Sequence, residues 1–307
     1  MAAELPGSGG AEPASPAAAQ RPSSVDAARF LTQASFGPRS VDEIEALRAE
    51  GYEHWLWAQF NAPTMLHTSY LDWQRQRADK FRADADMSYE AIWQQWLGGS
   101  DALRARMSFA LSQILVISNI APDMPAYALS SYMDLLNRHA FGNYRDLLEA
   151  VTLHPAMGHF LNLQGSEKAN AATGRVPDEN YAREVMQLFS IGLVELNEDG
   201  TSRTGAGGAT LETYTPADIS GLAKVFTGFS WACPDWPDNN CFLGGSNSGS
   251  SDPDRGFKPM LGYPQYHSTE VKTFLGTTIA AQTTSAPDTS LTTALDAIAA
   301  HANVGPF

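Results

Sequence analysis

Helix-forming patterns, each with recognisable start or stop signals, occupy most of the first 230 residues. Ser40 to Glu43 has the form of a capping box, and Gly51 stands where a helix would end. Thr215 and Pro216 form a second start signal, with an N-cap residue followed by proline at the first helical position. The apolar residues between Ser100 and Ile120 recur with a period near 3.6. Further helices are expected from Ser24 onward and over 54–60, 88–97, 127–139, 144–153, 155–162, 180–191 and 216–227.

Two segments depart from this helical pattern. Residues 193–215 contain two short apolar runs around Asp199-Gly200, which predicts a β-hairpin. Residues 233–267 are the longest irregular stretch, with 21 of 35 positions taken by Gly, Pro, Ser, Asn or Asp. We therefore expect a mainly α protein: a helical bundle with a small β-hairpin and long irregular loops.

The two ends of the chain are unusual. In residues 1–24, 18 positions are Ala, Gly, Pro or Ser, which predicts a disordered spacer. The segment lacks the features of a signal peptide but resembles the spacer that follows one, so an upstream export signal is expected. The chain stops at Phe307 just after a helix-like segment. We interpret residues 25–307 as a helical domain truncated at its C-terminus, the alternative being a natural terminus packed on the core.

The charge of the chain excludes several kinds of partner. Twenty Lys and Arg residues stand against 34 Asp and Glu residues, giving a net charge of -14 and a pI near 4.8. Binding to nucleic acid or to an anionic membrane depends on basic residues, so neither is expected. No stretch approaches the length of apolar sequence that a transmembrane helix needs.

The two cysteines, Cys233 and Cys241, lie close together in the irregular segment. The seven turn-forming residues between them allow a disulfide, which favours an oxidising compartment. A metal-binding pair would need further ligands nearby, and the usual Cys-x-x-Cys spacing is missing.

Four motifs, in order along the chain, carry a resemblance to a known family. The segment PDENYAREVMQLFSIG at 177–192 resembles the signature of the bacterial domain-of-unknown-function family 1800. Similar blocks stand at 29–38 (RFLTQASFGP), 213–231 (TYTPADISGLAKVFTGFSW) and 266–276 (YHSTEVKTFLG). Ser268 replaces an Asp that the family usually has. The chain corresponds to the N-terminal portion of the family, whose members continue beyond a segment like HANVGPF.

The resemblance implies a helical protein exported to the periplasm or the extracellular space. Family members are often encoded beside a second family of unknown function, number 1501, which resembles sulfatases. A co-exported sulfatase-like protein is therefore a possible partner. No catalytic mechanism or cofactor comes with the family name.

The helix over 179–191 holds the strongest candidate residues. Its polar face carries Glu179, Asn180, Arg183 and Glu184, next to the aromatic Tyr181. One interpretation is a solvated face with a Glu179–Arg183 ion pair. The other is a cleft in which Glu184 acts as a general base and Arg183 clamps a carboxylate or keeps Glu184 ionised. Glu179, Asn180 and Tyr181 would then contact the substrate.

Two histidines are candidates for the same site. His154 precedes a proline, which places it at a break between helices. His267 lies on the long loop and matches the family's loop histidine. His159 follows His154 by five residues, which is not the spacing of a helical metal clamp. A divalent metal held by His154, Glu184 and His267 is a further alternative.

Two hypotheses of function remain open. The first is an exported enzyme with a polar cleft built around the ENYARE helix, in which His154, Arg183 and Glu184 are catalytic and His267 binds substrate. It predicts that these residues converge. The second is a non-catalytic exported binding or assembly partner of a sulfatase-like protein. It predicts that they form a saturated structural network, with an exposed apolar patch elsewhere.

Overall fold

The computed structural model describes residues 12–13, 21–77, 85–118, 126–244, 252 and 254–307. The chain divides into two compact units. Unit 1 comprises Met1–Gln113 and Pro125–Asn143, and unit 2 comprises Ile114–Met124 and Tyr144–Phe307. The spacer expected at 1–24 falls largely outside the described residues, and the single helical domain expected over 25–307 stays a prediction.

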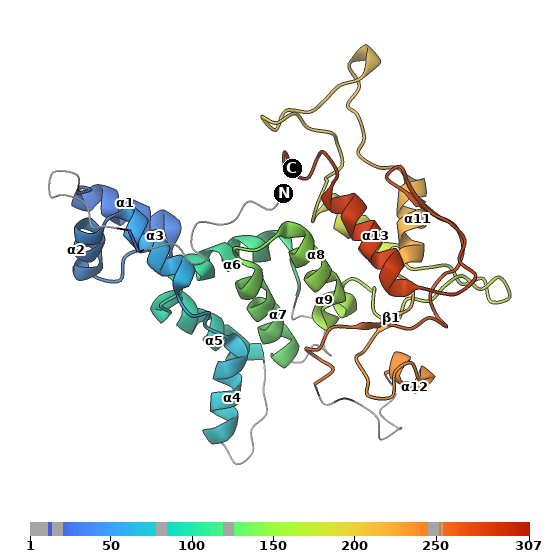
Figure 1. Cartoon of the computed structure of the whole chain (residues 1–307), viewed down its shortest axis with the longest axis horizontal. Coiled ribbons are helices and arrows are strands. Elements are labelled where there is room, and N and C mark those ends of the chain that lie inside the picture. Colours follow the sequence, from blue (N-terminus) through green and yellow to red (C-terminus); the bar gives the residue numbers. More distant parts are fainter. Residues whose placement is uncertain (1–11, 14–20, 78–84, 119–125, 245–251, 253) are drawn as a thin grey trace. The chain divides into compact units, whose positions relative to one another are not determined.

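Helices make up the described part of unit 1 (Figure 1). They are α1 (Ser24–Ala34), α2 (Val41–Glu50), α3 (Tyr52–Asn61), α4 (His67–Arg77), α5 (Ala85–Gly98), α6 (Ala102–Ile114, whose last residue belongs to unit 2) and α7 (Ala126–His139). The start and stop signals of α2 are confirmed: Ser40 Oγ accepts a hydrogen bond from Glu43 N at 3.2 Å, and Gly51 ends the helix with φ 89°. Local sequence therefore sets the bounds of α2.

The start of α4 is stabilised by a residue from another helix. Asp134 of α7 is fully buried, and its two carboxylate oxygens accept from the backbone N–H groups of His67 and Thr68 at 2.6 and 3.2 Å. The same oxygens accept from His67 Nδ1 at 2.9 Å and from Thr68 Oγ1 at 2.6 Å. Asp134 thus acts as the N-cap of α4 and satisfies hydrogen-bond donors at the positive end of the α4 dipole.

Unit 2 combines helices with two very small sheets. Its helices are α8 (Tyr144–Leu153), α9 (Pro155–Phe160), α10 (Asn180–Gln187), α11 (Pro216–Val225), α12 (Asn239–Phe242) and α13 (Pro287–Ala299), with a short 3-10 turn, η2 (Ala206–Gly208). The antiparallel pairs are β1 (Phe229–Ser230) with β2 (Leu261–Gly262), and β3 (Lys272–Phe274) with β4 (Thr277–Ile279). The mainly α fold with a small hairpin is therefore confirmed.

The regular hairpin is β3–β4, where Leu275 and Gly276 adopt the positive φ angles of a two-residue turn. Residues 193–215, where the sequence predicted a hairpin, also fold back on themselves. They form three short segments that pair only through isolated antiparallel bridges, Leu196–Ser202, Thr204–Thr210 and Val194–Glu212. The first turn is the one predicted at Asp199-Gly200, and glycines 205, 207 and 208 form a second turn within the arm expected to be continuous.

Helices α10, α11 and α13 build the core of unit 2. The start signal predicted at Thr215 and Pro216 is confirmed, and Thr215 and Asp218 also form a capping box at the start of α11. That helix packs on β3 so closely that a Cβ atom at Gly221 would lie 1.8 Å from the carbonyl oxygen of Thr273. Helix α13 lies against both α8 and α11 (Figure 1). Helix α10 in turn packs on α11.

Helix α10 is shorter than the sequence predicted. It ends at Gln187 rather than near Ile191, because Ser190 Oγ donates to the carbonyl of Val185 and Gly192 closes the turn with φ 66°.

Among the described residues, no helix has both the length and the apolar character needed to cross a bilayer.

Candidate functional site

Tyr181 of the ENYARE motif lies in the core of unit 2. Its side chain is buried, and its ring packs edge-on against Phe226 with 4.9 Å between centroids. The hydroxyl hydrogen-bonds with Thr152 Oγ1 at 2.7 Å. Burial raises the pKa of Tyr181 well above its ordinary range, so the hydroxyl stays protonated. The contacts of Tyr181 are those of a packing residue.

The polar residues of α10 lie on its outer face. Glu179 Oε1 accepts from Ser220 Oγ at 2.6 Å, and Glu179 Oε2 lies 3.7 Å from Arg183 Nη2. Both partners of this ion pair are nearly half exposed, so it contributes well under about 1 kcal/mol. Glu184 is partly buried, and its Oε2 atom has no hydrogen-bond partner among the described residues.

His154 caps a helix. It is buried at the N-cap position of α9, where its Nδ1 accepts from the backbone N–H of Ala156 at 3.1 Å. Pro155 follows at the first helical position, as the break predicted between α8 and α9 requires. The cap needs a lone pair on Nδ1, so this nitrogen cannot take up a proton without loss of the hydrogen bond.

His267 is fully buried in a separate hydrogen-bonded network. Its Nδ1 lies 2.7 Å from the carbonyl oxygen of Thr227 and therefore carries a proton, while its Nε2 lies 3.1 Å from Ser290 Oγ and accepts from that hydroxyl. Burial lowers the pKa of His267 to about 4; the hydrogen bond to Thr227 opposes this shift, and the charge of Lys272 adds to it. His267 is thus neutral near physiological pH.

The structure brings together only part of the predicted set. Glu179, Asn180 and Arg183 share the start and outer face of α10. Among the described residues, no three His, Cys, Asp or Glu side chains stand close enough to hold a metal ion. His154, Glu184 and His267 accordingly do not form a metal centre in this part of the chain.

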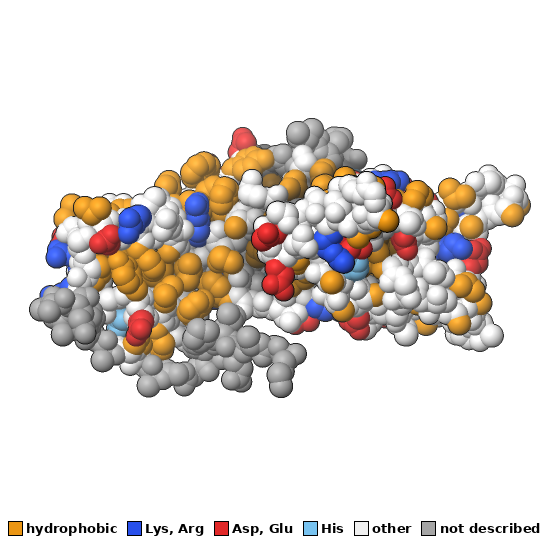
Figure 2. Space-filling view, turned by 90° about the horizontal axis from the view of Figure 1, so that it is seen from above, with side chains coloured by type: hydrophobic (Ala, Val, Ile, Leu, Met, Phe, Trp, Pro, Cys, Tyr) orange, Lys and Arg blue, Asp and Glu red, His pale blue; other side chains and the backbone are white. Residues whose placement is uncertain are grey.

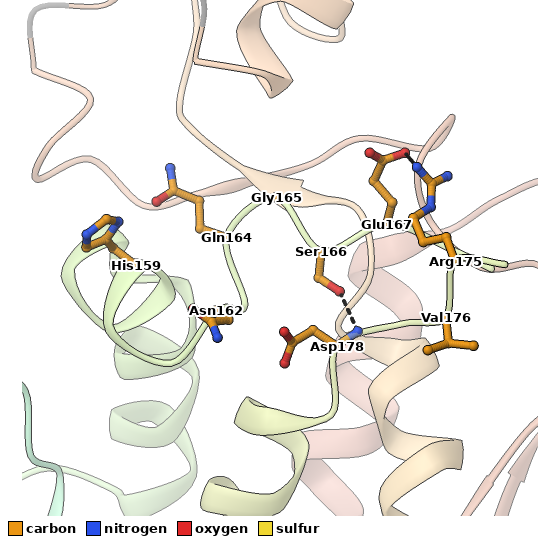
Figure 3. Close-up of a pocket in the computed structure, with 9 residues that line it drawn as sticks. All are labelled: His159, Asn162, Gln164, Gly165, Ser166, Glu167, Arg175, Val176 and Asp178. Atoms are coloured by element: carbon orange, nitrogen blue, oxygen red, sulfur yellow. Dashed lines mark hydrogen bonds and ion pairs between the residues drawn. The ribbon is translucent and has the colours of Figure 1, made fainter. Parts of the chain in front are cut away.

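A polar pocket of about 390 Å³ lies immediately before α10, in the loop that joins it to α9 (Figure 3). Seven of its nine lining residues have polar side chains, and the exceptions are Gly165 and Val176. The lining comprises His159, Asn162, Gln164, Gly165, Ser166, Glu167, Arg175, Val176 and Asp178. Asp178 belongs to the same motif as α10, so the pocket is adjacent to the predicted site.

Backbone hydrogen bonds anchor the pocket loop to the rest of unit 2. Gly165 N donates to Phe229 O at 2.8 Å, and Gly228 N donates to Ser166 O at 2.7 Å. Positive φ at Gly165, 75°, lets the chain turn at this point. Asp178 N donates to Ser166 Oγ at 3.2 Å across the loop. The pocket walls are therefore held by strand β1 and by the loop's own turn.

Charges within the pocket are unevenly paired. Arg175 Nη1 lies 2.6 Å from Glu167 Oε2, and Arg175 Nε donates to the carbonyl of Lys168 at 3.1 Å. Asp178 Oδ1 accepts from the backbone N–H of Asn180 at 2.8 Å. Its carboxylate points into the space between it and Asn162, with His159 on the far wall (Figure 3). An imidazole and a carboxylate thus face one polar cavity from two sides.

The predicted disulfide is confirmed, and residues next to it connect to the pocket loop. Cys233 and Cys241 are bonded with their Cα atoms 5.8 Å apart, and closing so short a loop contributes about 2–3 kcal/mol in the chain-entropy account. The neighbouring Phe242 stacks on Tyr266 with 3.8 Å between ring centroids. The carbonyl of Tyr266 accepts from Lys168 N at 2.9 Å. The disulfide-closed loop is therefore linked to the pocket loop indirectly, through Phe242 and Tyr266.

Sequence reasoning did not find the pocket. It treated His159 as a secondary candidate and passed over 162–176, because a turn-rich loop gives no periodic signal. The available signal was the polar run that leads into the motif at Asp178.

Together the fold and the pocket define a mainly α-helical protein with a polar, partly charged cavity beside a motif helix. Residues 29–307 match the model of the family described as "Protein of unknown function (DUF1800)", and the chain belongs to this family. Comparison with curated proteins and with solved structures gave no match.

Proposed function

We propose that the protein is an exported enzyme that binds a small polar substrate in the pocket before α10. The observation that carries this proposal is the placement of His159 and Asp178 on two walls of one polar cavity, with Asp178 in the family motif. In this account His159 transfers a proton and Asp178 holds the substrate. The disulfide is consistent with an oxidising, extracytoplasmic compartment.

The chemistry of these two groups fits those roles. Imidazole is the side chain most often used for proton transfer near neutral pH. Asp178 keeps one oxygen on the Asn180 N–H, which orients the carboxylate and leaves its other oxygen available to a ligand. The volume of about 390 Å³ suits a molecule of one or two sugar rings or of two amino acids.

His159→Gln and Asp178→Asn should separate the two roles. We expect Asp178→Asn to weaken ligand binding by about tenfold or more, because it removes a charged hydrogen bond. His159→Gln should leave binding largely unchanged and lower turnover by about 10²–10⁴-fold. Binding is measured by calorimetric titration with a panel of sugars, amino sugars and dipeptide amides, and turnover by product analysis of whichever compounds bind.

Asp146→Asn, on the exposed surface of α8, is the matched control for the charge change. Equal binding and turnover in the wild type and both pocket variants would refute the proposal. If binding depends on Asp178 but no bound compound is turned over, the pocket is a binding site and the proposal of an enzyme is refuted.

A second candidate function rests on a different surface. Helix α5 exposes Tyr89, Trp93 and Leu97 at four-residue spacing, with 43%, 55% and 64% of their surfaces accessible. Hydrophobic side chains also gather over the N-terminal helices on the face shown in Figure 2. Such a stripe favours a contact with another protein, and the partner proposed from the family resemblance is a co-exported sulfatase-like protein of family 1501.

Trp93→Glu tests this second function. If the stripe is the contact, the variant should lose co-elution with the purified sulfatase-like protein in gel filtration, because a charge would be buried in an apolar interface. Leu243→Glu, at another exposed apolar position, should not. Unchanged co-elution of Trp93→Glu, or no complex with the wild type, would contradict it.

A further inference from the structure

The charge of the pocket indicates what kind of ligand it accepts. Its lining carries two carboxylates, Glu167 and Asp178, and one guanidinium, Arg175. The guanidinium is already engaged by Glu167 at 2.6 Å and by the carbonyl of Lys168 at 3.1 Å. Among the lining residues, Asp178 is therefore the charge without a countercharge, and the pocket is negative near neutral pH.

Anionic ligands are disfavoured by this arrangement. A phosphate or carboxylate would meet an Arg175 whose charge is already paired with Glu167, and it would approach Asp178 with like charge. The net charge of -14 on the chain adds a repulsive field at longer range. The same charges favour binding of a cation, because it pairs with Asp178 and is attracted by the negative charge of the chain.

The groups around Asp178 are neutral hydrogen-bonding groups. Asn162 and Gln164 offer amides, and Ser166 Oγ accepts from Asp178 N while keeping its own O–H to donate. No Phe, Tyr or Trp ring is among the nine lining residues, so a flat ring system would find only the imidazole of His159 to stack on. The surroundings of the carboxylate thus suit hydroxyl and amide groups.

Resting on the proposed function, we infer that the substrate carries a primary ammonium group next to hydroxyl or amide groups. The ammonium binds Asp178, and its hydroxyl or amide neighbours bind Asn162 and Ser166. This chemistry is shared by amino sugars and by the amino end of a short peptide. Both fit a cavity of about 390 Å³.

Calorimetric titration of the full chain with two matched pairs tests the inference. The pairs are glucosamine against N-acetylglucosamine, and alanyl-alanine amide against its N-acetyl form, at mildly acidic pH where both amines are protonated. We expect the ammonium member of at least one pair to bind about tenfold more tightly or better, as a charged hydrogen bond implies. The pair that shows the difference identifies the source of the ligand.

Asp178→Asn should abolish that difference and leave the affinity for the acetylated member within about twofold of its wild-type value. Acetylated probes that bind as tightly as the amines, with the affinity for both lost in Asp178→Asn, would overturn the ammonium inference and leave the pocket function standing. Binding that neither Asp178→Asn nor His159→Gln alters would overturn both. Failure of all four probes to bind the wild type would overturn the ammonium inference alone.

Discussion

Asp134→Ala is expected to lower the free energy of unfolding of unit 1 by about 3–5 kcal/mol. The substitution removes four hydrogen bonds and leaves the buried donors of His67 and the partly buried donors of Thr68 unsatisfied at the start of α4. Urea unfolding followed by tryptophan fluorescence measures the effect, because five of the seven tryptophans lie in unit 1.

Because of Asp134, the stability of unit 1 is expected to fall at acidic pH. Burial alone would raise the pKa of Asp134, but hydrogen bonds and charge from His67, together with bonds from Thr68, lower it below its ordinary 3.8. A lowered folded pKa stabilises the fold above pH 3.8, and this stabilisation is lost as the pH falls through 3.8 and below.

Asp86→Ala, at an exposed first-turn position of α5, is the control, and it should lower the free energy of unfolding by less than about 1 kcal/mol. An Asp134→Ala variant as stable as the Asp86→Ala variant would contradict the capping role.

Lys272→Met should stabilise unit 2 by about 2–3 kcal/mol near neutral pH. Lys272 is fully buried, and within the described part of the chain its ammonium makes only long hydrogen bonds, 3.5 Å to Glu270 O and 3.4 Å to Gln282 Oε1. The nearby carboxylate of Glu270 is paired with Lys224 at 2.7 Å. Burial, then repulsion from Lys224, lowers the pKa of Lys272 to about 8. A methionine fills similar space without a charge.

The pH dependence of this effect has the same sign as that of Asp134, because folding lowers both pKa values and stability therefore rises with pH in each case, but it lies in an alkaline range. Between about pH 8 and pH 10.5 the unfolded chain holds a proton on Lys272 that the folded chain has released. Wild-type stability should therefore gain a favourable contribution from Lys272 as the pH rises across this range, and the advantage of Lys272→Met should shrink.

Urea unfolding at both ends of the pH range checks this. Lys258→Met, which removes a partly exposed ion pair to Asp252, should instead be slightly destabilising. If Lys272→Met destabilised unit 2 at both pH values, the hydrogen bonds of Lys272 would outweigh its burial and the account would be wrong.

Local sequence signals predicted the elements whose ends are set locally. Ser40, Gly51 and Thr215 lie at helix ends and act through neighbours within a few residues. Helix α4 was not predicted, since its cap comes from Asp134, 67 residues after His67. The sequence around His67 contains no signal that predicts Asp134 as its partner.

Periodicity identified residues that share a face but not what covers the face. Met107 belongs to the apolar pattern of α6, yet 38% of its surface is exposed. Tyr181 stands within a polar motif, yet its hydroxyl is satisfied by Thr152 inside the core. The pocket depends on tertiary hydrogen bonds such as that from Gly165 to Phe229, which no local pattern encodes. The site could therefore be located only to the neighbourhood of its motif.

Histidine-selective ¹⁵N NMR during titration with glucosamine and alanyl-alanine amide tests the pocket function most directly. His159→Gln assigns the His159 resonance by its disappearance. The account predicts a saturable shift of the His159 signal, abolished in Asp178→Asn, while the signals of the buried His67 and His267 stay in place. A His159 signal that neither compound moves, together with a saturable shift at another histidine, would contradict it.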